Sequence, residues 1–362
     1  MRRLMETIGT LFKAKLAFRL ALLYLSVLVL LVVALPWLPL PFLPNELDLS
    51  KVFAPPFHWE HYAANRPFHW LGTDALGRDV LVNIVYGART ALMISLPVML
   101  LATGLGLFMG SSAGLFGNHK LRISNARLLL LLPSLVAMAY YTLYVPFQLA
   151  LLKADMSAYI LPTILAFAIP GVLLFIGAPM LMRWDSLKKT TPFPFDHIVL
   201  RLIETLTSIP KLIFILVLAA FAPPSLLLLS ALLVLTFWTG PARLARGEML
   251  RIKELPYFEA AISSGVTQWQ LIWRHAMPNL LAPVAVSFVF GLAALLMIES
   301  TLSFLNIGVS TELVSWGRMI SGIRANTAAW WLVAFPGAFL SLTVLALQTC
   351  SYYLLQASQE KR

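Results

Sequence analysis

Apolar stretches long enough to cross a lipid bilayer recur along the whole of this 362-residue sequence. A spanning helix needs about 20 predominantly apolar residues. Hydrophobic residues make up 59% of the chain and charged residues 12%, with a mean hydropathy of +0.82. A soluble domain of this size cannot bury so much apolar surface. The sequence therefore predicts an all-α polytopic membrane protein with about eight spans. The expected spans are residues 19–38, 88–112, 127–150, 158–182, 200–222, 225–246, 279–300 and 331–355.

Basic residues in the short loops set the expected orientation. Lys and Arg gather in the loops at 113–126, 183–199 and 247–278 and at both termini. By the positive-inside rule, we expect these segments to be cytoplasmic. The first apolar run is too long for a signal peptide and lacks a cleavage site, which predicts an uncleaved spanning helix. The net charge of +11 fits loops that face an anionic membrane surface and does not indicate nucleic-acid binding.

Motifs that would indicate an enzyme are missing from the sequence. It contains no G-x4-G-K-[S/T] phosphate loop, no H-E-x-x-H pair and no apparent Ser-His-Asp set. The single cysteine, Cys350, excludes an internal disulfide and a cysteine-based metal site. Two histidines, His58 and His61, are too few to predict metal binding. We therefore expect no catalytic residue, no metal site and no cofactor bound by this chain.

A polar segment near residue 260 interrupts the apolar pattern with a predicted short helix. Pro256 suits a first helical turn, and Glu259 near the helix N-terminus is favoured by the helix dipole. Ala260 and Ala261 are strong helix formers that present a small face. Gly265 can adopt positive φ and end the helix.

A second short helix is expected directly afterwards. Thr267 and Gln270 have the spacing of a capping box, and Pro278 falls at the start of the next span. Together the two helices predict an elbow at the membrane surface. Two interpretations remain open: a docking element for a soluble partner, or an ordinary amphipathic surface segment.

Small residues in the second span predict close helix packing. Gly106, Gly110 and Gly114 recur at four-residue spacing, which lets helix backbones approach in lipid. The alternative is that this row lines a substrate path.

Ionisable residues near the outer ends of the spans are the other candidates for function. Glu299 would be costly facing lipid. With Ser303 it either lines a path or gate, or it pairs with a basic residue such as Arg318 or Arg324. A cluster of acidic and basic residues lies in a turn that contains glycines. We interpret it as an outer-loop network whose charged groups pair with one another; the alternative is a contact with an external protein. Its members are Asp74, Arg78 and Asp79.

Several blocks of the sequence resemble the binding-protein-dependent ABC importer permeases of the dipeptide, oligopeptide and nickel group. The E-A-A-x3-G pattern at 259–265 is similar to their coupling loop, and residues 240–247 resemble its lead-in. Residues 299–308 and 315–317 are similar to their last outer loop. The outer-loop motif that precedes the first core helix is carried by Gly72, Thr73, Asp74, Gly77, Arg78 and Asp79.

This resemblance implies a type I permease core of the second-permease type, with both termini cytoplasmic and a location in the bacterial inner membrane. The family pattern breaks after residue 117 and resumes near 196, which indicates an inserted transmembrane hairpin. The implied organisation is an N-terminal helix and outer loop (1–68), a core (69–117 and 195–356), the hairpin (118–194) and a coupling loop (247–278). The residues implied to couple to ATPases are Glu259, Ala260, Ala261, Gly265 and Pro278.

The resemblance also implies partners and a mechanism. A homologous second permease, two cytoplasmic ATPase subunits that bind ATP and magnesium, and an external solute-binding protein would complete an importer working by alternating access. Peptides or peptide-like solutes are the expected cargo, with nickel or another small solute as the alternative. An ATP-independent secondary transporter or channel is the remaining class. Such proteins use charge pairs and broken helices at the midplane, whereas the apolar runs of this sequence carry almost no midplane charge.

Overall fold

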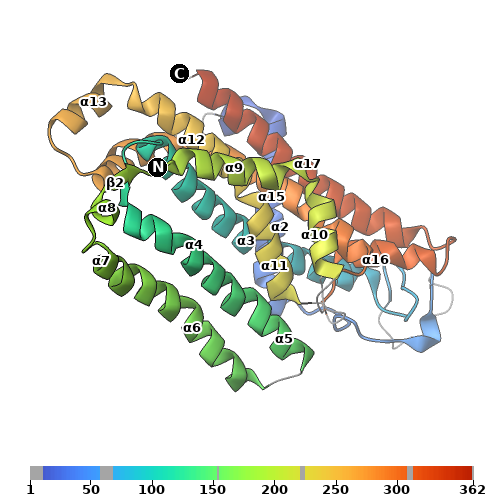
Figure 1. Cartoon of the computed structure of the whole chain (residues 1–362). Coiled ribbons are helices and arrows are strands. Elements are labelled where there is room, and N and C mark those ends of the chain that lie inside the picture. Colours follow the sequence, from blue (N-terminus) through green and yellow to red (C-terminus); the bar gives the residue numbers. More distant parts are fainter. Residues whose placement is uncertain (1–10, 58–67, 153–154, 221–224, 308–312, 361–362) are drawn as a thin grey trace. The chain divides into compact units, whose positions relative to one another are not determined.

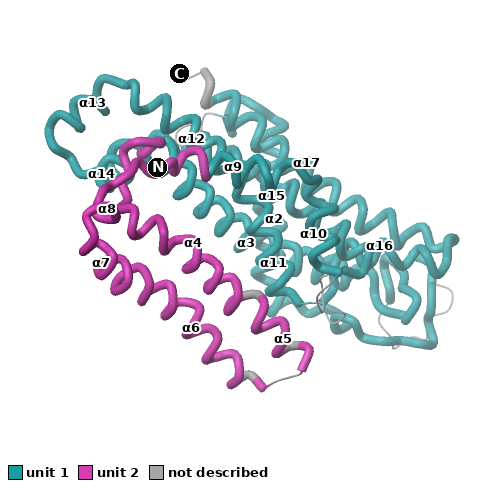
Figure 2. Tube along the Cα trace, viewed as in Figure 1, with its two compact units in different colours: residues 1–115, 199–362 teal, residues 116–198 magenta. Residues whose placement is uncertain are grey.

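The computed structural model describes residues 11–57, 68–152, 155–220, 225–307 and 313–360. The chain divides into two compact units, residues 1–115 with 199–362 (unit 1) and residues 116–198 (unit 2) (Figure 2). Both are helical (Figure 1). His58 and His61 lie outside the described residues.

Unit 1 is built from long apolar helices joined by short helices and turns. Among its described residues the longest helix is α3, of 37 residues. The elements are α2 (Leu16–Ala34), η1 (Leu35–Trp37), η2 (Leu49–Lys51), α3 (Val80–Phe116), α9 (Phe195–Ser208), α10 (Lys211–Ala220), α11 (Leu226–Phe237), α12 (Thr239–Lys253), α13 (Pro256–Ser263), α14 (Gln268–Gln270), η6 (Leu271–Ala276), α15 (Met277–Phe304), α16 (Trp316–Ser321), η7 (Gly322–Arg324) and α17 (Trp331–Glu360).

Seven helical segments among the described residues are long and apolar enough to cross a membrane. They confirm a multi-pass helical fold and correspond to seven of the eight expected spans, with bounds that differ by one residue or more. Their bounds are Leu16–Trp37, Val80–Phe116, Asn125–Leu149, Ser157–Leu181, Leu226–Lys253, Gln268–Phe304 and Trp331–Ala357.

The expected span at 200–222 differs from a single straight helix. It consists of α9 and α10, which meet at an angle of 81°. Pro210 lies at this break; proline lacks an N–H and disfavours helical backbone in the residue before it. The pair is therefore either one broken span or a re-entrant segment.

Among the described residues of unit 1, two hydrophobic clusters pack other helices against α17. In the first, Val80 and Ile84 of α3 pack with Trp331 and Leu332 of α17. In the second, Phe18 of α2 packs against the later part of α17. Helix α2 is also tied to α17 by the hydroxyl groups of Tyr24 and Thr343, 2.9 Å apart.

Unit 2 is a helical hairpin closed by a short antiparallel sheet. Strands β1 (Arg122–Ser124) and β2 (Thr190–Pro192) pair with Ile123 opposite Thr191. Because this sheet joins the start and end of the hairpin, both arms leave from one place (Figure 1). The helical elements between the strands are α4 (Asn125–Ala139), η3 (Tyr140–Tyr144), α5 (Val145–Leu151), η4 (Met156–Tyr159), α6 (Ile160–Gly171), η5 (Val172–Gly177), α7 (Ala178–Leu181) and α8 (Asp185–Lys188).

The hairpin buries little of its apolar surface within the chain. In the most apolar windows of its two arms, 6% and 11% of residues are buried. Leu132 and Phe175 have exposed fractions of 70% and 81%. Such surface is compatible with lipid and costly in water.

Candidate functional site

The polar elbow begins at α13, whose two faces differ sharply. Pro256 occupies the first turn, and Glu259 lies in the same turn with its side chain exposed. Phe258 is fully buried and Ala261 nearly so, which anchors the helix to unit 1. Ala260 is exposed instead. The two alanines were expected to present one small face, but they lie on different faces of α13: Ala261 packs inward and Ala260 faces outward.

Gly265 ends α13 in the left-handed conformation that the sequence predicts. Its φ is +77°. The Val266 N–H donates to the Ala261 carbonyl at 3.2 Å, and the Gly265 N–H donates to the Ile262 carbonyl at 3.0 Å. This pair of hydrogen bonds is a Schellman cap, which satisfies carbonyls at the end of the helix. A side chain at Gly265 would meet no atom within 4 Å, so backbone conformation alone favours glycine there.

The second half of the elbow runs without interruption into the next span. Thr267 and Gln270 form the expected capping box, with both hydrogen bonds 3.4 Å long. The short helix continues through the π-helical turn η6 into α15, where Pro278 occupies the first turn. The second short helix expected from the sequence is therefore the first part of a membrane-spanning helix.

Side-chain contacts connect the elbow to the spanning helices. The Asn279 Nδ2 of α15 donates to the Tyr257 hydroxyl of α13 at 2.8 Å. The Lys253 ammonium, at the end of α12, donates to the Gly114 carbonyl of α3 at 2.9 Å. The rings of Trp269 and Phe108 are 6.5 Å apart. The elbow is therefore in contact with α15 through α13 and with α3 through α14, so a displacement of the whole elbow would strain contacts with both spanning helices.

The three glycines spaced by four residues on α3 lie against α12 and Trp238, the residue that precedes it. A Cβ on Gly106 would lie 2.5 Å from the Trp238 carbonyl oxygen, and one on Gly110 would lie 2.1 Å from the Ala242 oxygen. A Cβ on Gly114 would meet the Met249 side chain at 2.8 Å. Real Cβ atoms essentially never come within 3.0 Å of such atoms, so this approach of helices requires glycine.

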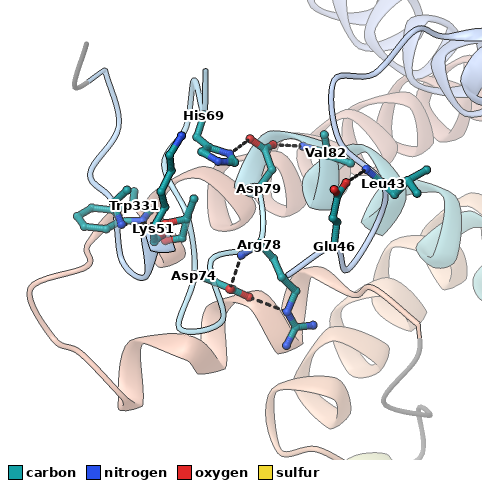
Figure 3. Close-up of polar contacts among 11 residues, drawn as sticks. Leu43, Glu46, Lys51, His69, Asp74, Arg78, Asp79, Val82 and Trp331 are labelled. Atoms are coloured by element: carbon teal, nitrogen blue, oxygen red, sulfur yellow. Dashed lines mark hydrogen bonds and ion pairs between the residues drawn. The ribbon is translucent and has the colours of Figure 1, made fainter. Parts of the chain in front are cut away.

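The outer-loop motif packs around the N-terminus of α3 (Figure 3). Asp79 caps that helix, because its Oδ1 accepts the Val82 N–H at 2.7 Å. Its Oδ2 lies 2.8 Å from the His69 Nδ1, and both side chains are almost fully buried. Asp74 accepts the main-chain N–H of Arg78 at 2.9 Å, and its Oδ2 lies 3.3 Å from the Arg78 Nε.

Backbone contacts complete this turn. Gly72 and Gly77 have φ of +81° and +72°, and a Cβ on either would strike main-chain oxygens of the preceding loop. The Thr73 hydroxyl donates to the Lys51 carbonyl and accepts the Ala54 N–H at 2.8 Å. The indole N–H of Trp331 donates to the Thr73 carbonyl at 3.0 Å. The six motif residues thus lie together around one turn and its adjoining loop.

Glu299 is 1% exposed near the end of α15 that lies away from the elbow. Three hydroxyl groups donate to its carboxylate: Ser303 at 2.8 Å, Ser315 at 3.1 Å and Ser300 at 3.3 Å. Ser315 precedes α16, so these bonds fasten α16 to α15. Arg324, one of the two basic partners weighed from the sequence, lies over the ring of Phe304 with its guanidinium carbon 4.3 Å from the ring centroid.

Several of these contacts could not be read from the sequence. Tyr257 and Asn279 are 22 residues apart, and Ser315 lies 16 residues after Glu299. Asn45, whose Oδ1 accepts from the Arg78 Nη1 at 2.8 Å, lies 33 residues before it. Local spacing carries no signal for such pairs. The Asp79 cap did have a local signal, because an acidic residue directly before a long apolar run is typical of a helix N-cap.

The fold and this geometry together define a multi-pass helical membrane protein that carries a polar, capped elbow between two spans. Residues 190–361 match the family described as the binding-protein-dependent transport system inner membrane component.

Similar curated proteins agree with this match. The oligopeptide transport system permease protein OppC of Haemophilus influenzae is 25% identical over 325 residues, covering 90% of this chain and 78% of that protein. The dipeptide transport system permease protein DppC of Bacillus subtilis is 26% identical, covering 77% and 64%. The probable D,D-dipeptide transport system permease protein DdpC of Escherichia coli is 24% identical, covering 88% and 78%.

Residues 190–361 therefore carry the inner membrane component of binding-protein-dependent transport systems, and the similarity of most of the chain to peptide permeases identifies it as an ABC permease subunit. It is a multi-pass protein of the bacterial inner membrane with the type I permease fold. As the membrane component of a transporter, it is a permease subunit and not an enzyme.

Proposed function

We propose that this chain forms half of the translocation pathway of an ATP-driven importer for peptides or peptide-like solutes. The relatives named above are permeases of oligopeptide, dipeptide and D,D-dipeptide transport systems, and they support this cargo. A homologous second permease supplies the other half of the pathway. An external binding protein delivers the solute, and the two permeases alternate between outward and inward access.

The observation that carries this proposal is the elbow formed by α13 and α14. Its inner face is anchored by Phe258 and Ala261, while Ala260 and Glu259 face outward. Tyr257 and Ile262 are also exposed on α13, at 42% and 41%. A short, rigidly capped helix with an exposed apolar and acidic face suits a groove on a soluble partner.

We assign that partner as a cytoplasmic ATPase, two of which serve the two permeases and bind ATP and magnesium. The positive-inside bias supports a cytoplasmic location for the elbow. Because the elbow contacts α3 and α15, a movement of the ATPase that displaces the elbow would also move these spanning helices. Glu259, Ala260, Ala261, Gly265 and Pro278 are the coupling residues in this account: two face the ATPase, and three shape the elbow.

Glu299 and Ser303 act in this account at the opposite end of α15. Because the carboxylate is buried among three hydroxyl groups, we assign it to holding α16 against α15 in this conformation and not to contacting solute. Release of α16 would then accompany opening of the pathway at that end. The glycine seam on α3 keeps that helix and α12 together throughout the cycle.

Reconstitution tests the proposed function. The chain alone in proteoliposomes should show neither ATPase activity nor flux of labelled dipeptides or oligopeptides. Adding the second permease, the ATPases and the binding protein should give peptide uptake that requires ATP. Peptide flux down its gradient through the lone chain would contradict the importer mechanism. Nickel uptake by the complete complex, without peptide uptake, would contradict the cargo.

A further inference from the structure

The closed end of the hairpin in unit 2 carries a dense group of exposed basic side chains, which we call the basic cluster. Its members lie in the two short segments 120–127 and 183–189 and are Lys120, Arg122, Arg127, Arg183, Lys188 and Lys189. Asp185 is the one acidic residue within these segments. Among the residues that the structure describes, no member of the cluster forms an ion pair within the chain. The cluster therefore presents a strong excess of positive charge to its surroundings.

Hydrogen bonds that use no basic side chain bring the two segments together. Strand β1 pairs with β2, and the Lys189 carbonyl accepts the Asn125 N–H at 2.9 Å. The Asn125 Nδ2 donates to the Ser186 carbonyl at 3.4 Å, and its Oδ1 accepts the Thr191 hydroxyl at 3.2 Å. The first turn of α4 consequently lies beside α8 and β2 (Figure 1). The charged groups themselves are left available for a ligand.

The arms that leave the basic cluster have the surface of lipid-facing spans. Almost all of their apolar side chains are exposed within the chain. Trp184 is exposed beside the cluster, and Tyr140 and Tyr144 are exposed farther along the first arm. Roughly 25 Å of helix separates Arg127 from Tyr144, which is close to the hydrocarbon thickness of a bilayer, about 30 Å. Because Trp and Tyr are enriched at both membrane interfaces, this spacing suits a cluster at the level of the lipid headgroups.

We propose that the basic cluster binds the phosphate groups of anionic phospholipids, in the leaflet that the positive-inside bias identifies as the cytoplasmic one. Guanidinium and ammonium groups both donate charge-assisted hydrogen bonds to phosphate oxygens. Six cations exceed what one phosphate can engage, so the cluster holds several headgroups around the end of the hairpin. The apolar arms and the exposed Trp184 favour lipid over an acidic soluble protein as the ligand. This inference does not depend on which solute the transporter carries.

Quenching of a fluorophore by brominated lipids tests the inference on the full chain in proteoliposomes. The fluorophore is attached at Leu128→Cys in a Cys350→Ser background, because Leu128 is exposed and directly follows Arg127. The membranes mix phosphatidylglycerol with phosphatidylcholine, and only one of the two lipids is brominated in each sample. We expect phosphatidylglycerol to be preferred at this site about fivefold or more. The preference should fall as the salt concentration rises from about 0.05 to 0.5 M, because salt screens exposed charges.

Three neutral substitutions made together should remove most of this preference. They are Arg127→Gln, Lys188→Gln and Lys189→Gln, and the ratio of quenching by the two lipids should approach one. The pair Lys188→Gln and Lys189→Gln covers the case in which the triple variant does not insert. Both lysines are exposed at the end of α8, and the pair should lower the preference about twofold or more.

The matched control removes the same charge from unit 1 through Lys13→Gln, Lys15→Gln and Arg19→Gln, all at exposed positions. It should keep the full preference for phosphatidylglycerol at residue 128. Equal quenching by both lipids in the unmodified chain would overturn the inference. An inserted triple or double variant of the cluster that keeps the full preference would overturn it too. So would an equal loss in the control, because the preference would then follow net charge and not the basic cluster.

Discussion

Replacing Gly110 by alanine tests the close packing of α3 against α12. The added methyl group would lie 2.1 Å from the Ala242 carbonyl oxygen, whereas ordinary contacts are 3.4–4 Å. The opposing atom belongs to the backbone, so the helices must separate by roughly 1 Å, and overpacking of this kind costs about 1–3 kcal/mol. Gly104→Ala is the control on the same helix, because a Cβ there meets no atom within 4 Å.

Both substitutions replace glycine in a helix interior, which favours the helix by about 1 kcal/mol. That contribution is common to both, so the difference between the two variants isolates the clash. We expect the unfolding free energy of Gly110→Ala, measured by titrating SDS into mixed micelles, to be about 1–3 kcal/mol below that of Gly104→Ala. Gly114→Ala should lie between them, since a Met249 side chain can move. Equal unfolding free energies for Gly104→Ala and Gly110→Ala would refute the packing argument.

Two further predictions concern the end of α15 and the hairpin. Glu299→Ala removes the acceptor of three hydroxyl groups and should lower the free energy of unfolding by about 1–3 kcal/mol. Glu299→Gln keeps one acceptor oxygen and replaces the other by an N–H₂ donor, so its free energy of unfolding should fall by less. Equal stability in both variants would contradict the assigned role. Asp155→Cys in a Cys350→Ser background should react with an impermeant thiol reagent added from the outside, because residue 155 joins the hairpin arms. Labelling from the cytoplasmic side alone would show that the hairpin does not span the membrane.

The elements that depend on local sequence were predictable. Seven spans follow from hydropathy alone, since lipid selects long apolar helices. The caps at Gly265 and Thr267 follow from backbone chemistry within six residues of each. The bend between α9 and α10 had visible signals in Pro210 and in the charged residues Arg201, Glu204 and Lys211, which interrupt the apolar pattern of the expected span.

The contacts between distant residues were not predictable. The hydroxyl groups around Glu299 come partly from Ser315, and the tyrosine that binds Asn279 lies on another helix. Such pairs form because whole helices pack, and no periodicity in the sequence records which side chains then meet. For the same reason the sequence could not tell that Ala261 packs inward while its neighbour Ala260 faces outward.

The central claim is that the exposed face of α13 engages the ATPase, and Ala260→Trp tests it most directly. Ala260 is exposed on α13, so tryptophan there should leave unit 1 intact but obstruct a partner's groove. Ala168→Trp, at an exposed position of the hairpin helix α6, is the matched control. The measurement is peptide uptake per ATP hydrolysed by the complete complex in proteoliposomes. We expect Ala260→Trp to insert normally and lose uptake, through detached ATPases or unproductive hydrolysis, while Ala168→Trp transports at the unmodified rate. An assembled Ala260→Trp complex with unmodified uptake and ATP use would contradict the account.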